Sequence, residues 1–174
     1  MATFLRRKAA VLALGVLTLT LAGGGIAAAA QPAANAPVGA VQPGHQPPVT
    51  AAQSQAAKAA IRVAAAPPAA GTVAWAVVSI DGTLLQHSAN VTGAFRFPCC
   101  GGGVTAGQYQ VTLDYDVHLK SYQATIGTND PNNVPPGGEV SVSPRYLIPN
   151  AVFVQTRNSA GGAADRPFHI LIAN

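Results

Sequence analysis

Three polar side chains at alternate positions, Asp114, Asp116 and His118, are of the types that hold metal ions. Two carboxylates and an imidazole on one face of a β-strand could ligate a divalent cation. The residues between them are apolar, however, and this alternation is equally typical of an amphipathic strand with one wet face. Because no second cluster with ligand spacing follows, we predict a solvent-facing strand here and no metal site.

Residues 129–133 read Asn-Asp-Pro-Asn-Asn, and their side-chain oxygens could contact a calcium ion. The run lacks the spaced acidic ligands of a calcium-binding loop. Asn, Asp and Pro are also the residues that a tight turn needs, so we predict a turn.

Asp165 and His169, together with serines elsewhere in the chain, have the residue types of a hydrolytic triad. Nothing in the sequence resembles the nucleophile elbow that presents a reactive serine. We interpret Asp165 as the exit of a hairpin and His169 as part of the last strand, and we predict no catalytic residue and no cofactor. The sequon that begins at Asn90 would matter only in a glycosylating host.

Six aromatic side chains in the C-terminal part could stack on sugar rings if they shared an exposed face. Aromatic residues more often fill a core, where each removes about 150–250 Å² from water. We favour the core for this group, which comprises Trp75, Phe95, Phe97, Tyr109, Tyr115 and Tyr122.

Cys99 and Cys100 are the two cysteines of the chain, and they are adjacent. Neighbouring Cα atoms lie about 3.8 Å apart, closer than the roughly 4.4–6.8 Å of an ordinary disulfide. A bond between them would close a minimal loop and restrain almost no chain entropy. A vicinal disulfide, which we favour, two free thiols and a bridge to a second chain stay open, and none of them would hold the domain together.

The chain has 174 residues, of which 9% are charged, and its N-terminal part has a leader pattern. A basic cluster at residues 6–8 precedes an apolar run at 9–21, and Ala28-Ala29-Ala30 offers a cleavage site. We therefore predict a signal peptide over residues 1–30. The alternative is an uncleaved membrane anchor, which would be the chain's one contact with a membrane. The pair Arg6-Arg7 leaves the twin-arginine export route open.

Residues 31–70 are rich in Ala and Pro and contain no aromatic residue. Such a segment buries too little apolar surface to offset its ordering entropy, so we predict a disordered linker. Within it, residues 51–63 could be helical for part of the time.

The formal net charge of +4 belongs to the leader and the linker, because residues 71–174 hold five basic and six acidic residues. A nucleic-acid-binding domain would show a basic face or stripe, so nucleic acid is excluded as the expected partner. The length also excludes the large catalytic barrels, which need roughly 200 residues or more.

From Gly71 the pattern changes to a period of two, with a hairpin signal at Asp81-Gly82. Seven or eight short strands follow one another to residue 172, one of them predicted over residues 109–118. This spacing is typical of a small antiparallel β-sandwich, Ig-like or barrel-like, over residues 71–174.

Most of residues 72–173 resembles a group of small secreted β-domains of high-GC, actinobacteria-like bacteria. The matching motifs are Val-Ala-Trp-Ala-Val-Val at 73–78, Gly-Gln-Tyr-Gln-Val at 107–111, Tyr-Gln-Ala-Thr-Ile-Gly at 122–127 and Asp-Arg-Pro-Phe-His at 165–169. These motifs are strand and turn patterns, so the resemblance implies a fold and is silent on activity. Domains of this group often carry cysteines where this chain has Ser121 and Asn174, so a disulfide there is not available.

Together these observations predict a secreted or cell-envelope β-domain without catalysis. It would act in adhesion, in ligand binding through its loops or as a structural part, with a cell-surface glycan or protein as the expected kind of partner. The alternative is a secreted hydrolase or an inhibitor-type effector. An enzyme needs a pocket with a perturbed ionisable group, whereas a binding module needs an exposed apolar patch.

Overall fold

A computed structural model describes residues 46–63, 68–99 and 104–174. These ranges contain one α-helix and eight β-strands, which confirms the predicted all-β class. In chain order they are α2 (Ala51–Val63), β1 (Val73–Val78), β2 (Leu84–His87), β3 (Val91–Arg96), β4 (Gln108–Leu113), β5 (Ser121–Ile126), β6 (Gly138–Pro144), β7 (Ala151–Asn158) and β8 (Phe168–Ala173). The predicted signal peptide lies outside the described residues.

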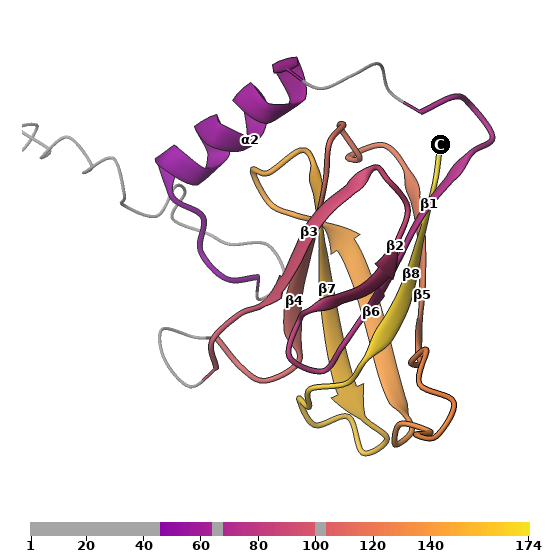
Figure 1. Cartoon of the computed structure of the whole chain (residues 1–174). Helices are drawn as coiled ribbons and strands as arrows, with labels where there is room; N and C mark the ends of the chain where they lie inside the picture. The colour runs from indigo at the N-terminus through magenta and orange to yellow at the C-terminus, as the bar shows by residue number, and fades with distance from the viewer. Residues whose placement is uncertain (1–45, 64–67, 100–103) are drawn as a thin grey trace, which may run out of the picture. The chain divides into compact units, whose positions relative to one another are not determined.

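The strands form two four-stranded antiparallel sheets, one of order β2-β1-β8-β5 and the other of order β3-β4-β7-β6 (Figure 1). β1 pairs with β8 from Val73 opposite Ala173 to Val78 opposite Phe168, and β5 pairs with the other edge of β8. The sheets stay separate and do not close on each other, so the fold is a β-sandwich and not a barrel.

The core lies between the sheets and follows the two-residue alternation of the sequence. On β8 the side chains of Phe168, Ile170 and Ile172 are fully buried. From the opposite sheet, Tyr109 on β4 meets Phe168 edge to face, with ring centroids 5.2 Å apart. The Tyr109 hydroxyl donates to the Ile80 carbonyl oxygen at 3.0 Å, so this buried phenol has a partner.

β4 is shorter than the sequence predicts. The expected strand continues to His118, but β4 ends at Leu113. Its neighbour β3 begins at Val91, which pairs with Leu113, so no ladder continues beyond this point. Every second side chain is still buried after β4 ends, because Tyr115 and Val117 extend from a loop into the core. Periodic burial in the sequence therefore does not by itself indicate strand pairing.

The helix α2 begins with a capping box. The Thr50 hydroxyl accepts a hydrogen bond from the Gln53 backbone N–H at 3.2 Å. In return, the Gln53 side-chain oxygen accepts from the Thr50 backbone N–H at 2.8 Å. This reciprocal pair satisfies amide groups that otherwise lack partners at a helix start, and it explains why the helix begins there.

Residues 46–63 are ordered, and this corrects the prediction of a disordered linker for that part of residues 31–70. Val49 is fully buried and Ala57 is nearly so, and both pack with Ile148 and Ala151 beside β7. The burial of these side chains offsets the conformational entropy that the segment loses when it is ordered. The composition of the segment alone did not indicate this burial. Of the other linker residues, 31–45 and 64–67 lie outside the described ranges. Within those ranges, no helix combines the length and apolar character needed to cross a membrane.

Candidate functional site

The segment that precedes α2 is fixed to the sandwich by the side-chain amide of Gln46. Its nitrogen donates to the Ser143 hydroxyl at 3.0 Å and to the Pro144 carbonyl oxygen at 2.9 Å. Its oxygen accepts from Arg145 Nη1 at 3.0 Å and from the Tyr146 backbone N–H at 2.9 Å. One amide thus uses both donor hydrogens and accepts twice at the end of β6.

Arg145 is a buried cation, 2% exposed. Its Nε donates to Gln110 Oε1 at 3.1 Å, its Nη2 donates to the Pro47 carbonyl oxygen at 2.7 Å, and its Cζ lies 5.2 Å from the centre of the Phe97 ring. Desolvation lowers the pKa of Arg145 to about 10, so it stays charged at neutral pH. No carboxylate forms an ion pair with it among the described residues. The acceptors of its hydrogen bonds are neutral oxygen atoms of Gln46, Pro47 and Gln110. Gln46 and Pro47 precede α2.

One face of α2 turns toward the sandwich. The Ser54 hydroxyl donates to the Leu147 carbonyl oxygen at 2.8 Å, and Ala57 is buried on the same side. Lys58 and Arg62 are exposed at the edge of this face, where they border the space between α2 and the sandwich.

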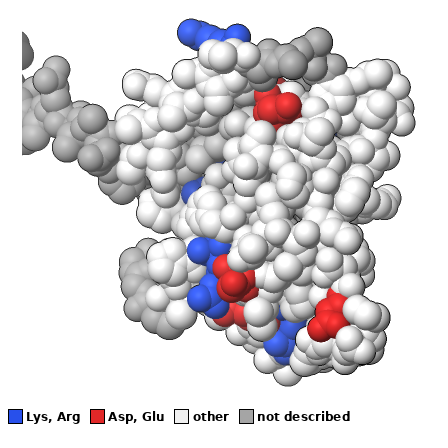
Figure 2. Space-filling view, in the orientation of Figure 1, with Lys and Arg blue, Asp and Glu red and all other residues white. Residues whose placement is uncertain are grey.

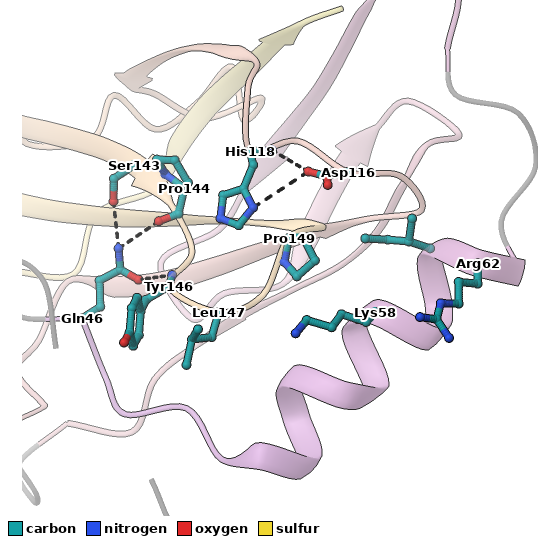
Figure 3. A pocket seen from close by; sticks show the side chains of 11 residues that line it. Gln46, Lys58, Arg62, Asp116, His118, Ser143, Pro144, Tyr146, Leu147 and Pro149 are labelled. Atoms are coloured by element: carbon teal, nitrogen blue, oxygen red, sulfur yellow. Dashed lines mark hydrogen bonds and ion pairs between the residues drawn. The ribbon is translucent and has the colours of Figure 1, made fainter. Parts of the chain in front are cut away.

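A cavity of about 910 Å³ lies between α2 and the sandwich, and we call it the helix groove. This volume falls within the roughly 300–1,000 Å³ of small-molecule sites. Ile61 of α2 contributes to its apolar wall, as do Pro144, Leu147 and Pro149 at the connection between β6 and β7. Figure 3 shows Leu147 and Pro149 across from the helix.

Besides Tyr146, four ionisable side chains line the helix groove, namely Lys58 and Arg62 from α2 and Asp116 and His118 from the β4–β5 loop (Figure 3). Asp116 Oδ1 accepts from the His118 backbone N–H at 2.9 Å and lies 4.0 Å from His118 Nδ1. Neither Lys58 nor Arg62 forms an ion pair with another residue in the part of the chain that the structure describes. The groove therefore has two uncompensated cations on one side and an Asp–His pair on the other.

The three residues considered as metal ligands separate in the structure. Asp114 accepts a hydrogen bond from Asn90 Nδ2 at 3.3 Å, whereas Asp116 and His118 line the helix groove. All three lie in the loop after β4, which corrects the prediction that they share one face of a strand. Among the described residues, no group of three His, Cys, Asp or Glu side chains is placed to hold a metal ion.

Residues 129–133 form the predicted turn. Asp130 Oδ1 accepts from the Asn132 backbone N–H at 2.9 Å, and the Asp130 carbonyl oxygen accepts from the Asn133 N–H at 3.3 Å. The carboxylate is used to shape its own loop.

Asp165 and His169 make no hydrogen bond or ion pair with each other. Asp165 pairs with Arg96 and accepts from the Gly107 backbone N–H at 2.6 Å. His169 lies on β8, beside Gly127. The two side chains thus have separate structural neighbours.

The six aromatic residues do not form one face. Tyr109 and Tyr115 are buried and Tyr122 packs against the core, as predicted. Trp75 and Phe95 are 38% and 43% exposed, which corrects the core prediction for these two. They stand on β1 and β3, which belong to different sheets, so they do not make a shared sugar-stacking surface.

Cys99 is exposed at the end of a described range, and Cys100 lies outside the described residues. The three thiol states of this pair stay predictions.

Charged side chains are sparse on the face shown in Figure 2. The blue Lys and Arg patches there are small and separated, and several adjoin red acidic ones. A basic stripe of the kind that tracks nucleic acid is not present on this face of the described molecule.

Sequence reasoning missed Gln46 and Lys58, which line the helix groove, and Arg145, which holds the segment before α2. One local signal was available, because Thr50 and Gln53 have the spacing of a capping box.

Comparison of the chain with protein-family models, curated proteins and solved structures finds no match.

Proposed function

We propose that this chain is an exported, non-catalytic binding domain, secreted or held at the cell envelope, that takes its ligand in the helix groove. The leader pattern of residues 1–30 supports export. Ligand binding is supported by the groove itself, which is large enough for a small molecule and is built by an ordered helix.

The observation that carries the proposal is the combination of an apolar wall with a few polar groups. Ile61 and Leu147 offer apolar surface from the two sides of the groove, and Lys58 adds a charge with no ion-pair partner among the described residues. Small-molecule sites have this composition, in which apolar walls supply affinity and a few polar groups fix orientation.

A neutral apolar dye, Nile red, tests the groove in the full chain. We expect saturable fluorescence enhancement in the wild type and its loss in Ile61→Trp, which fills the groove from α2. Leu85→Trp, at an exposed position of β2, is the matched control and should bind the dye like the wild type. Thermal melting verifies that both variants fold. Equal dye binding in Ile61→Trp and the wild type would contradict the proposal.

The Asp116–His118 pair favours hydrolysis as a second candidate function. A histidine beside a carboxylate can act as a general base when it faces a substrate. Assay of the full chain against short-chain aryl esters decides between the two functions. Turnover that disappears in His118→Ala would support the hydrolase, and an unchanged background rate in both proteins would support the binding domain.

A further inference from the structure

We propose that the ligand of the helix groove is an amphipathic carboxylate, with one anionic end held by Lys58 and Arg62 and a long apolar body along the opposite wall. This inference rests on the proposed function and names the ligand class of the same site.

The positive charge of α2 favours a ligand with an anionic group. Lys58 and Arg62 are four residues apart on one helix face and line the groove together. Neither has an ion-pair partner among the described residues, and α2 has no acidic residue in its sequence. An acidic group in the groove would give both cations the partner that the protein does not.

The Asp116–His118 pair places the anionic end on the helix side. Asp116 lines the groove from the β4–β5 loop and would repel a carboxylate brought close to it. Figure 3 shows Lys58 extending from α2 toward Leu147. The favourable position for an anion is therefore at the charged ends of Lys58 and Arg62 and not beside Asp116.

The apolar wall of the groove favours a ligand whose remaining part is hydrocarbon. Pro144, Leu147 and Pro149 present carbon surface along the sandwich side, and Ile61 faces them from the helix. A small inorganic anion would leave this wall exposed to water, whereas a hydrocarbon chain would cover it. The same wall disfavours a ligand that is polar along its whole length.

Displacement of Nile red from the full chain tests the ligand class, with a long-chain saturated carboxylate compared with the alcohol and the primary amine of the same chain length. All three are used below the concentration at which they aggregate. We expect the carboxylate to displace the dye at the lowest concentration and the amine at the highest. The preference for the carboxylate over the alcohol should shrink as salt is raised, because these cations are exposed to solvent.

The double variant Lys58→Ala/Arg62→Ala should weaken carboxylate displacement about tenfold and leave the alcohol unchanged. Alanine keeps the helix propensity of α2. The matched control Lys120→Ala/Arg157→Ala removes two positive charges outside the groove and should behave like the wild type. Equal displacement by carboxylate and alcohol in the wild type would overturn the ligand class and leave the proposed function standing. Dye binding that Ile61→Trp does not affect would overturn both.

Discussion

Gln46 and Arg145, 99 positions apart in the sequence, are joined by a hydrogen bond of 3.0 Å from the guanidinium to the side-chain amide oxygen. Arg145 is buried and has no ion-pair partner in the described part of the chain, so its charge depends on neutral acceptors. This contact makes the segment before α2 part of the domain, and the domain in turn holds the helix that forms one side of the groove.

The Gln46→Ala variant should lose about 2–3 kcal/mol of unfolding free energy, because it leaves Nη1 of the buried Arg145 and the Tyr146 backbone N–H without an acceptor. Chemical denaturation of the full chain measures the effect. Gln55→Ala, which removes an exposed glutamine of α2, is the control and should stay within about 0.5 kcal/mol of the wild type. If the two variants are equally stable, the contact does not anchor the segment.

Gly82→Ala should be much more destabilising than Gly71→Ala, although both glycines have a positive φ, of 91° and 84°. The shared conformational strain costs about 1–2 kcal/mol for alanine. At Gly82 the new methyl group would also overlap the backbone of Phe95 and Arg96, whereas at Gly71 it would meet nothing within 4 Å. We expect a further loss of about 1–3 kcal/mol from this overlap, measured by urea unfolding. Similar losses in both variants would show that the turn at Gly82 can move away from β3.

Asp81 should stabilise the turn between β1 and β2 except at low pH. Hydrogen bonds from the Ser79 hydroxyl and then from the Thr83 backbone N–H hold the pKa of Asp81 at about 2, below its ordinary value of 3.8. Because the pKa is lowered in the folded state, the stabilisation is present above about pH 4 and is lost as the pH falls toward about 2.

The difference in Tm between the wild type and Asp81→Asn should therefore be constant near neutral pH and shrink between about pH 4 and about pH 2. Thermal melts across this range measure it. A difference that is the same at both ends of the range would mean that the carboxylate charge is not used in the turn.

The sandwich was predictable because its signals are local. The alternation that buries Phe168, Ile170 and Ile172 is visible in the sequence, and so is the turn at Asp81-Gly82. The same alternation gives a wrong strand prediction at Tyr115 and Val117, where side chains are still buried although strand pairing has ended. Period two reports which side chains face the core, and it does not report whether a neighbouring strand is present.

The helix groove was not predictable in the same way, because it depends on contacts between distant segments. The Ala-rich sequence of α2 has no large apolar stripe of its own, and its position depends on Gln46 meeting Arg145. A charged residue such as Arg145 is ordinarily expected at the surface. Asp116 and His118 were recognised as chemically interesting, but their neighbours across the groove, Lys58 and Arg62, come from a segment predicted to be disordered.

Hydrogen exchange of the full chain, followed by mass spectrometry, tests most directly whether α2 is docked and the helix groove exists. A free helix of 13 residues is marginal in water, so protection of α2 amides requires contact with the sandwich. We predict slow exchange in α2 of the wild type, and an acceleration of exchange in Gln46→Ala that is larger in α2 than in β8. Exchange of wild-type α2 at the rate of an unstructured peptide would contradict the account.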